Sequence, residues 1–443
     1  MKKNYILFLS IAFVWNLNAQ IVNIPDANFK NKLLSSDPSN EIAKDLNGNY
    51  FKIDNNSDQE IQINEAANVS ALNISDAYIS SLVGIESFIN LQFLNCENNQ
   101  INALDVNSLN NLLDLNCINN QLTMLEVTGL SNLQSLNCGN NQITILGLSG
   151  LNNLKNLICS NNQLSTLNTV ALSNLQFLDC RYNLLTEIDL QNLGSLQELN
   201  CEDNNINTLN ASGLSNLQTM HCGYNHLTTL NIASSLNLQA LYCNNNDLTT
   251  LNASGLSNLL YLDCTYNQLN VLNLGGLNNL QMLECRYNQL TTLNASETPN
   301  LVFLGCQNNY QLSSLYIKNG ANESLNANHN NNINYVCADE FQLWAIDSRI
   351  SNPNCVITSD CNLSVTEVTI PTNKIKVYPN PAKNILTIEV DAVIRNVSIY
   401  NLLGQIILVS ETSIVDVSNI EPGYYLAKLS TDKGNFNTRF IKE

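Results

Sequence analysis

The central part of the chain repeats one arrangement of apolar and polar positions every 21 residues. Eleven consecutive units, beginning at residues 91–111, open with Leu-x-x-Leu/Met-x-Cys-x-x-Asn, and positions 11, 14 and mostly 19 are aliphatic. A unit of this length can bury its apolar side only against its neighbours. The periodicity therefore predicts a solenoid in which each unit is one coil.

Within each unit, apolar and polar residues alternate before the chain reaches an asparagine. In the first unit Leu94 and Cys96 flank Asn95, a period of two that predicts a short strand with both apolar side chains facing inward. The chain must then turn, and the asparagine at position 9, Asn99 here, can hydrogen-bond to backbone groups of its own and adjacent coils. We expect these side chains to stack as an asparagine ladder.

The repeat resembles that of the leucine-rich repeat family, whose pattern Leu-x-x-Leu-x-Leu/Cys-x-x-Asn-x-Leu is matched with cysteine at the third apolar strand position. The resemblance covers about half of the chain. It implies an α/β-type solenoid with a parallel β-sheet on its concave face and a mostly irregular convex side. We expect this solenoid to occupy residues 69–322, with a degenerate first coil at 69–90.

Each of the eleven units has a cysteine at position 6. In adjacent strands these thiols would form a column with a spacing of about 4.8 Å. A metal site is disfavoured, because zinc needs thiolates that converge tetrahedrally rather than lie in a line. Disulfides between coils need a specific side-chain dihedral angle, and eleven is an odd number. We interpret the cysteines as small buried hydrophobes at a position where leucine would overpack.

The segments outside the repeats differ from them in composition. Residues 1–19, with two lysines before an apolar run, are typical of a cleaved secretory signal peptide; an uncleaved anchoring helix is the alternative. We expect residues 20–68 and 323–361 to cap the ends of the solenoid, and residues 362–373 to form a linker. In a secreted chain, two of the three cysteines of the C-terminal cap can pair, and the sequence leaves open which two of Cys337, Cys355 and Cys361 do so.

The N-terminal cap contains a candidate calcium site. Residues 54–65 have the spacing of an EF-hand loop, with oxygen-bearing side chains at positions 1, 3, 5 and 12 and a hydrophobe at position 8. Position 6 is Gln59, where the EF-hand needs glycine, so Gln59 must adopt a positive φ at some energetic cost. The alternative is an acidic, solvated loop. The expected ligands are Asp54, Asn56, Asp58, the carbonyl group of Glu60, and Glu65.

Residues 374–443 contain about seven short alternating segments separated by turn-forming residues, which predicts a small immunoglobulin-like β-sandwich. The segment resembles the C-terminal sorting domain of the type IX secretion system of Bacteroidetes bacteria at residues 377–381 (VYPNP), 399–405 (IYNLLGQ), 422–425 (PGYY) and 440–443 (FIKE). The resemblance implies export by that machinery, followed by release or attachment to the outer-membrane surface. An ordinary immunoglobulin-like accessory domain is the alternative.

Composition and the lack of catalytic motifs argue against several classes of function. The 443 residues include 37 acidic and 19 basic side chains, a formal net charge of −18. Such a chain is a poor partner for nucleic acids. After residue 19 no segment is long and apolar enough to cross a membrane. The sequence lacks a phosphate loop, a nucleophile motif and HExxH, and nothing indicates the closed pocket that a glycan-active enzyme would need, so we expect no enzyme.

The outward strand positions 3 and 5 are the predicted ligand-binding surface, because on a solenoid they form one continuous concave face. Exposed aromatic residues with polar neighbours are typical of recognition surfaces. We therefore expect a secreted or cell-surface binding or adhesion protein that recognises a protein partner. A polysaccharide ligand is the alternative, and a structural spacer would leave this face featureless. The candidate ligand-binding residues are Phe177, Asp179, His221, Tyr242, Tyr261, Asp263, Glu284 and Phe303. Position 8 adds an edge row of Tyr182, Tyr224, Tyr266 and Tyr287.

Overall fold

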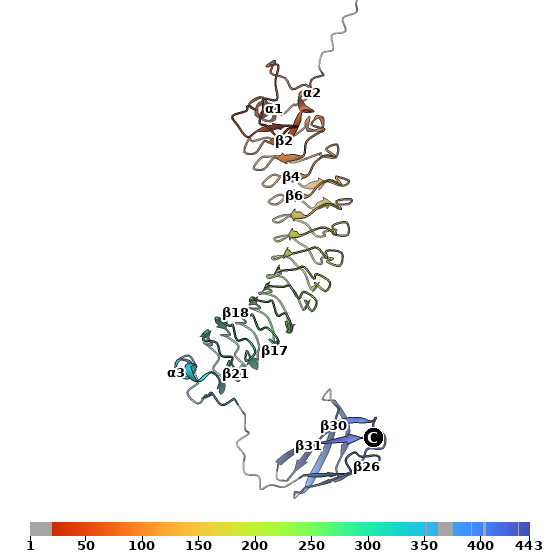
Figure 1. Ribbon diagram of the computed structural model, residues 1–443, viewed down its shortest axis with the longest axis vertical. Coiled ribbons are helices and arrows are strands. Elements are labelled where there is room, and N and C mark those ends of the chain that lie inside the picture. Colours follow the sequence, from red (N-terminus) through yellow and green to blue (C-terminus); the bar gives the residue numbers. More distant parts are fainter. Residues whose placement is uncertain (1–19, 351, 362–374, 391, 402–404, 433) are drawn as a thin grey trace, which may run out of the picture. The chain divides into compact units, whose positions relative to one another are not determined.

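The computed structural model describes residues 20–350, 352–361, 375–390, 392–401, 405–432 and 434–443. The expected signal peptide at 1–19 and linker at 362–373 lie outside the described residues, as does part of the motif at 399–405. The chain divides into two compact units, residues 1–361 and 362–443 (Figure 1). In the described part of the chain, no helix has the length and apolar character needed to span a bilayer.

The first unit is a stack of coils that contributes 14 strands to one sheet, here called the main sheet (Figure 1). From β2 (Val69–Asn73) onward neighbouring strands pair in parallel and in register, so that Leu94 lies beside Leu115 of the next coil. This arrangement confirms the predicted solenoid. The following strands are β3 (Phe93–Asn95), β4 (Asp114–Asn116), β6 (Ser135–Asn137), β8 (Asn156–Ile158), β9 (Phe177–Asp179), β10 (Glu198–Asn200), β12 (Thr219–His221), β14 (Ala240–Tyr242), β16 (Tyr261–Asp263), β18 (Met282–Glu284), β20 (Phe303–Gly305) and β22 (Ser324–Asn326).

The interior of the coils has the composition that the repeat predicts. The central residue of each main-sheet strand from β3 to β22 points inward, and the eleven repeat cysteines are buried with it. Burial raises the pKa of the Cys201 thiol to about 12. Its sulfur donates a weak hydrogen bond to the carbonyl oxygen of His221 in the next coil, at 3.5 Å. The cysteines therefore pack as small hydrophobes and also contact the backbone of the adjacent coil.

The position-9 asparagines form the predicted ladder, as Asn204 illustrates. Its amide nitrogen donates to the carbonyl oxygens of Cys180, Cys201 and Glu202 at 3.1–3.2 Å. Its Oδ1 accepts a hydrogen bond from the backbone nitrogen of Leu185 at 3.0 Å. One side chain thus satisfies backbone groups of two coils at a turn where no sheet supplies partners.

A second asparagine ladder, at position 21, was not predicted. Asn216 donates to the carbonyl oxygen of Gly194 in the preceding coil at 2.9 Å, and Asn237 donates to Ser215 at 2.8 Å. Equivalent bonds recur in most coils, on the exposed side of the solenoid. This ladder joins coils through solvent-exposed amides and so contributes less per bond than the buried one.

The side of the coils opposite the main sheet is partly irregular and partly stranded. Short strands occur on this side of several coils, mostly at positions 13–15 with one inward leucine between two outward residues, as at Leu209. The last two strands have Val336 and Ile357 at the centre instead. The short strands pair in parallel in separate small sheets. These strands are β5 (Met124–Glu126), β7 (Ile145–Gly147), β11 (Thr208–Asn210), β13 (Thr229–Asn231), β15 (Thr250–Asn252), β17 (Val271–Asn273), β19 (Thr292–Asn294), β21 (Ser314–Tyr316), β23 (Tyr335–Cys337) and β24 (Val356–Thr358).

The solenoid continues beyond residue 322, where the sequence pattern places its end. Strand β22 joins the main sheet, Ala327 occupies the cysteine position in the interior, and Asn330 donates to the carbonyl oxygen of Cys306 at 2.8 Å. Part of the segment expected as a cap is therefore another coil, hidden because alanine replaces cysteine within an asparagine-rich stretch.

The two ends of the solenoid are closed by short helices and strands. At the N-terminus, α1 (Ala27–Leu34) buries Phe29 and Leu33, and β1 (Ala43–Asp45) pairs antiparallel with β2. The helix α2 (Ile63–Ala66) and the 3-10 helix η1 (Ile85–Ser87) lie between this cap and the first regular coil. At the C-terminus, η2 (Glu340–Gln342) and α3 (Leu343–Asp347) lie between Cys337 and Cys361. These two cysteines form a disulfide, which decides the pairing left open by the sequence.

The second unit is the predicted β-sandwich. One sheet has the order β25-β26-β29 and the other the order β28-β27-β30-β31, all antiparallel. Leu386, Ile399 and Phe440 are among the side chains buried between the strands. The strands are β25 (Lys376–Tyr378), β26 (Ile385–Glu389), β27 (Ile394–Tyr400), β28 (Ile406–Ser410), β29 (Ile414–Asp416), β30 (Gly423–Thr431) and β31 (Gly434–Lys442).

Candidate functional site

The main-sheet face, defined as the outward side chains at strand positions 3 and 5, is the surface that the sequence predicts to be concave. Strand register places these side chains in two parallel columns. Position 5 runs through Asp179, Asn200, His221, Tyr242, Asp263, Glu284 and Gly305. Position 3 runs through Phe177, Glu198, Thr219, Ala240, Tyr261, Met282 and Phe303. Most of the candidate residues therefore lie together on strands β12 to β20, whereas Phe177 and Asp179 lie two strands before His221.

The aromatic pair His221 and Tyr242 occupies the middle of the position-5 column. The two rings stack with centroids 4.5 Å apart and planes 9° from parallel. His221 Nδ1 lies 3.8 Å from Glu202 Oε1, which comes from position 7 of the preceding coil. The rings form a flat surface with a carboxylate at its side, an arrangement suited to contact with a planar or cationic group.

Asp179 is the least accessible of the candidate residues, with only 6% of its surface exposed. Its carboxylate accepts a hydrogen bond from the backbone nitrogen of Arg181 and lies 3.3 Å from Arg181 Nε. Burial raises the pKa of Asp179, and the hydrogen bond and charge of Arg181 oppose that shift. The arginine, which was not among the predicted ligand-binding residues, is the more exposed partner.

Glu284 lies over a glycine of the next strand. A Cβ atom on Gly305 would approach Glu284 Oε2 to 2.1 Å, so any other residue there would displace this carboxylate. Arg286 Nε is 3.8 Å from Glu284 Oε2, and neither atom makes a hydrogen bond within the described chain; the same is true of Gln307 Oε1 nearby in register. Burial, reinforced by Asp263, raises the pKa of Glu284, and Arg286 opposes the shift. Buried polar atoms without partners gain from a ligand that can hydrogen-bond to them.

An apolar run accompanies this polar group. Tyr261, Met282 and Phe303 occupy position 3 of three adjacent strands, and the first two are 37% and 42% exposed. Met282 was not among the candidate residues, although its position in the register predicts that it bridges the two aromatic side chains. The run is a continuous apolar strip next to the Asp263 and Glu284 carboxylates.

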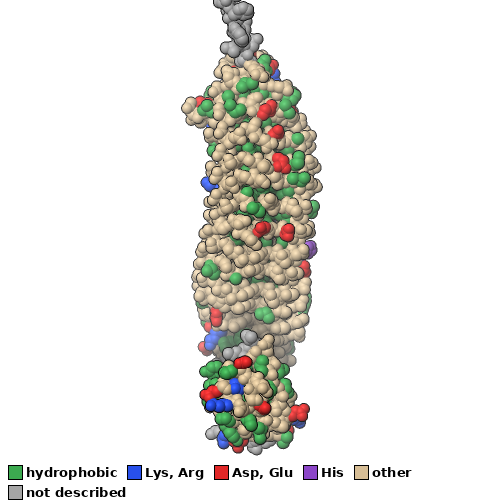
Figure 2. All heavy atoms as spheres, turned by 90° about the vertical axis from the view of Figure 1, so that its right-hand side faces the viewer, with side chains coloured by type: hydrophobic (Ala, Val, Ile, Leu, Met, Phe, Trp, Pro, Cys, Tyr) green, Lys and Arg blue, Asp and Glu red, His purple; other side chains and the backbone are tan. Residues whose placement is uncertain are grey.

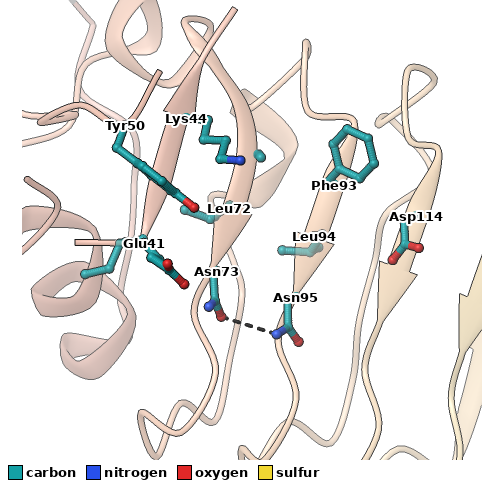
Figure 3. A pocket seen from close by; sticks show the side chains of 11 residues that line it. Glu41, Lys44, Tyr50, Leu72, Asn73, Phe93, Leu94, Asn95 and Asp114 are labelled. Atoms are coloured by element: carbon teal, nitrogen blue, oxygen red, sulfur yellow. Dashed lines mark hydrogen bonds between the residues drawn. The ribbon is translucent and has the colours of Figure 1, made fainter. Parts of the chain in front are cut away.

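A pocket lies at the N-terminal end of the main-sheet face (Figure 3). Phe93 and Asp114 come from strands β3 and β4, and Lys44 and Tyr50 come from the cap. Lys44 Nζ lies 4.8 Å from the centre of the Tyr50 ring. The sequence analysis did not assign these residues to a site, because the cap has no repeat that would place it beside the sheet.

The candidate calcium loop has the backbone that the sequence requires, with Gln59 at φ +67°. Its acidic side chains bond to the chain itself. Glu65 accepts hydrogen bonds from the backbone nitrogens of Asn55 and Gln62, each at 3.0 Å, and caps α2. Asp54 accepts from the backbone nitrogen of Asp58 at 3.2 Å. Among the described residues no group of three or more His, Cys, Asp or Glu side chains is arranged to hold a metal ion, so calcium binding stays a prediction.

Comparison with known proteins identifies both units. Residues 376–443 match the family model of the secretion system C-terminal sorting domain. The functional domain of InlJ from Listeria monocytogenes, described as including a cysteine ladder, is 22% identical and has a TM-score of 0.50, with 96% of this chain and 98% of that chain covered. The first unit has the leucine-rich repeat fold, and the second is a secretion sorting domain.

Two further structures share the fold of this leucine-rich repeat protein. An internalin, InlF, from Listeria monocytogenes is 21% identical with a TM-score of 0.57, covering 75% of this chain and 97% of that chain. A leucine-rich repeat protein from Leptospira interrogans is 25% identical with a TM-score of 0.51, covering 65% and 83%. No curated protein sequence matches the chain. The sorting domain confirms the predicted localisation, secreted or attached to the outer-membrane surface.

The face of the protein shown in Figure 2 is largely polar, with more acidic than basic side chains. In the view of Figure 2, acidic side chains are scattered along the solenoid and basic ones are few, consistent with 37 acidic and 19 basic residues in the chain. Most of the visible surface is neither charged nor hydrophobic. On the main-sheet face, Tyr261, Met282 and Phe303 place three large apolar side chains on adjacent strands.

Proposed function

We propose that this leucine-rich repeat protein is a secreted or cell-surface binding protein, active in adhesion, that recognises a protein partner through the main-sheet face. The observation that carries the proposal is the apolar run of Tyr261, Met282 and Phe303 beside Asp263 and Glu284. Large apolar side chains bordered by charges are the usual energetic centres of protein interfaces.

The chemistry of the face supports a protein partner more than a repetitive ligand. Successive strands present different groups at position 5, namely an imidazole, a phenol and two carboxylates. A folded protein can match such an irregular arrangement of charge and shape. Glu284 Oε2 and Arg286 Nε are 3.8 Å apart and make no hydrogen bond within the described residues, so they add polar groups to which a partner can hydrogen-bond.

The same geometry supports binding rather than catalysis. The carboxylates of the position-5 column lie on an open sheet, and Asp179 is paired with Arg181. Paired carboxylates act as catalysts when a closed pocket holds them around a substrate. The main-sheet face offers contact area instead.

The experiment that tests this function is an array of purified surface and extracellular proteins, with glycans as a second arm, probed with the chain lacking residues 1–19. The test variant combines Tyr261→Ser, Met282→Ser and Phe303→Ser. The matched control combines Met124→Ser, Ile145→Ser and Val271→Ser, which are exposed apolar residues on strands β5, β7 and β17 of the opposite side.

We expect the test variant to lose at least tenfold in affinity for a captured protein, or about 1.4 kcal/mol. The control variant should bind like the parent. Equal binding by the parent and the test variant would place the site elsewhere. If the parent captures only a glycan and the test variant does not, the ligand of the main-sheet face is a polysaccharide and not a protein.

A further inference from the structure

We propose that the position-8 tyrosines form a second binding site, separate from the main-sheet face, for an extended neutral polysaccharide. This tyrosine strip comprises Tyr182, Tyr224, Tyr266 and Tyr287. The inference does not depend on the protein-binding function proposed above, because it concerns side chains on a different edge of the coils.

The backbone at position 8 is left-handed in every regular coil. From Asn98 to His329, φ lies between 50° and 61° at this position. Asparagine and aspartate tolerate this conformation, whereas it is unfavourable for a bulky side chain. Six coils have asparagine at position 8 and one has Asp203, so a small polar residue is sufficient for the coil to fold. Tyr266 and Tyr287 stack on each other, but the coil does not require tyrosine at a position where seven other coils fold with asparagine or aspartate.

The tyrosine side chains are also exposed. Their relative exposures are 50% for Tyr182, 53% for Tyr224, 47% for Tyr266 and 39% for Tyr287. The Tyr266 and Tyr287 rings stack on each other with centroids 4.3 Å apart. The strip therefore combines strained backbone with aromatic surface in water, two costs that binding of a ligand would offset.

The first three tyrosines of the strip are evenly spaced, and Tyr287 follows Tyr266 after one further coil. Tyr182, Tyr224 and Tyr266 are 42 residues, or two coils, apart. Since adjacent parallel strands are separated by about 4.8 Å, these tyrosines recur roughly every 9.6 Å. That interval is similar to one disaccharide of an extended β-1,4-linked polysaccharide. A periodic row suits a periodic polymer, whereas a folded protein surface has no such repeat.

The neighbouring side chains suit sugar hydroxyl groups. Position 10 follows position 8 after the buried position 9 and is mostly exposed. Most coils of the strip have an amide or another hydrogen-bonding side chain at position 10. In the coils of the strip these residues are Leu184, Asn205, His226, Asp247, Gln268 and Gln289. Aromatic faces that pack on sugar rings, together with such groups, are a combination suited to carbohydrates. The net charge of −18 disfavours an anionic polymer.

The repeat itself supplies the variant that tests the strip. Tyr224→Asn, Tyr266→Asn and Tyr287→Asn together install the residue that other coils have at position 8, and should leave the melting temperature equal to or above that of the parent. The control replaces Tyr78 and Tyr310 with asparagine. Both control tyrosines are exposed and outside the strip, and Tyr78 also has a positive φ of 54°.

The measurement is affinity electrophoresis of the chain lacking residues 1–19 through gels that contain β-1,4-xylan, glucomannan or alginate. We expect a neutral glycan to retard the parent and the control, with at least tenfold weaker retardation of the strip variant and little effect of alginate. The main-sheet variant Tyr261→Ser, Met282→Ser and Phe303→Ser should be retarded like the parent, which separates this site from the proposed protein site. Migration of the parent unaffected by both neutral glycans, or equal retardation of the parent and the strip variant, would overturn the proposal. The proposal would also be overturned if the parent bound no glycan and the strip variant lost the capture of a protein partner.

Discussion

At the residue scale, each coil must satisfy the backbone groups of the turn that follows its main-sheet strand. The position-9 asparagine does this from inside the solenoid, where water is absent. The position-21 asparagine makes a single comparable bond on the exposed side. The two ladders use the same chemistry in different surroundings, so their contributions to stability should differ.

We predict that Asn204→Ala lowers the free energy of unfolding by about 3 kcal/mol, because it leaves the buried N–H of Leu185 without a partner and removes one hydrogen bond from each of three backbone carbonyls. Asn216→Ala, which removes one exposed hydrogen bond, should cost about 1 kcal/mol or less. Urea unfolding followed by circular dichroism measures both. Similar midpoints for the two variants would contradict the assignment of the main stabilising role to the buried ladder.

The buried thiols predict a loss of stability in alkali. Folding raises the pKa of Cys201 from its usual value of 9.0 to about 12, because burial disfavours the thiolate. Above pH 9 the unfolded chain therefore releases a proton that the folded chain keeps. The stabilising effect is complete below pH 9 and is lost as the pH rises towards 12, by up to about 1.4 kcal/mol per pH unit for each such thiol.

Cys201→Ala should reduce the slope of the free energy of unfolding against pH in this alkaline range by the contribution of one proton. The packing lost with the sulfur atom should lower the free energy of unfolding equally at all pH values. The slope of the free energy of unfolding against pH, measured by urea titration above pH 9, checks the prediction. An unchanged slope would mean that the thiol does not titrate differently in the two states.

At the element scale, the strands show how far the repeat determines the structure. The alternation of Leu94, Asn95 and Cys96 predicted a main-sheet strand, and its inward and outward faces are confirmed. The strands at positions 13–15 were not predicted, because a single leucine between two polar residues also fits an irregular segment. The coil around Ala327 was not predicted for a similar reason, because alanine stands at the inward position where the other coils have cysteine.

The candidate site was predictable only where register alone decides it. Strand register placed His221, Tyr242 and Asp263 on adjacent strands, as the repeat implies. The covering of Asp179 by Arg181 depends on side-chain conformations that no periodicity encodes. The pocket between the cap and the sheet likewise depends on long-range contacts of a segment without repeats.

The calcium loop is tested as an element of the cap. We predict that calcium raises the melting temperature, because bound ion would hold Asp54, Asp58 and Glu65 together; at a free concentration 100-fold above the Kd the gain is about 2.7 kcal/mol. Thermal unfolding in calcium and in EGTA measures it. Asp58→Asn should abolish the response, whereas Asp37→Asn, in the same cap but outside the loop, should keep it. Identical melting curves in calcium and EGTA would exclude the site.

At the scale of the whole molecule, the two units have separate tasks. The sorting domain directs the chain to the cell surface or beyond, and the solenoid presents a long, largely polar surface there. Because parallel coils repeat in register, a change in one coil alters one row of side chains without disturbing the others. That independence allows one solenoid to hold an irregular main-sheet face and a regular tyrosine strip.

The most direct test of the main-sheet face is hydroxyl-radical footprinting of the full-length secreted protein with and without a protein captured on the array. Tyrosine, methionine and phenylalanine side chains report their own solvent exposure in this measurement. We predict that Tyr261, Met282 and Phe303 become protected in the complex, while Met124 on the opposite side of the coils keeps its reactivity. Unchanged oxidation of Tyr261 and Met282 in a saturated complex would contradict recognition through this face.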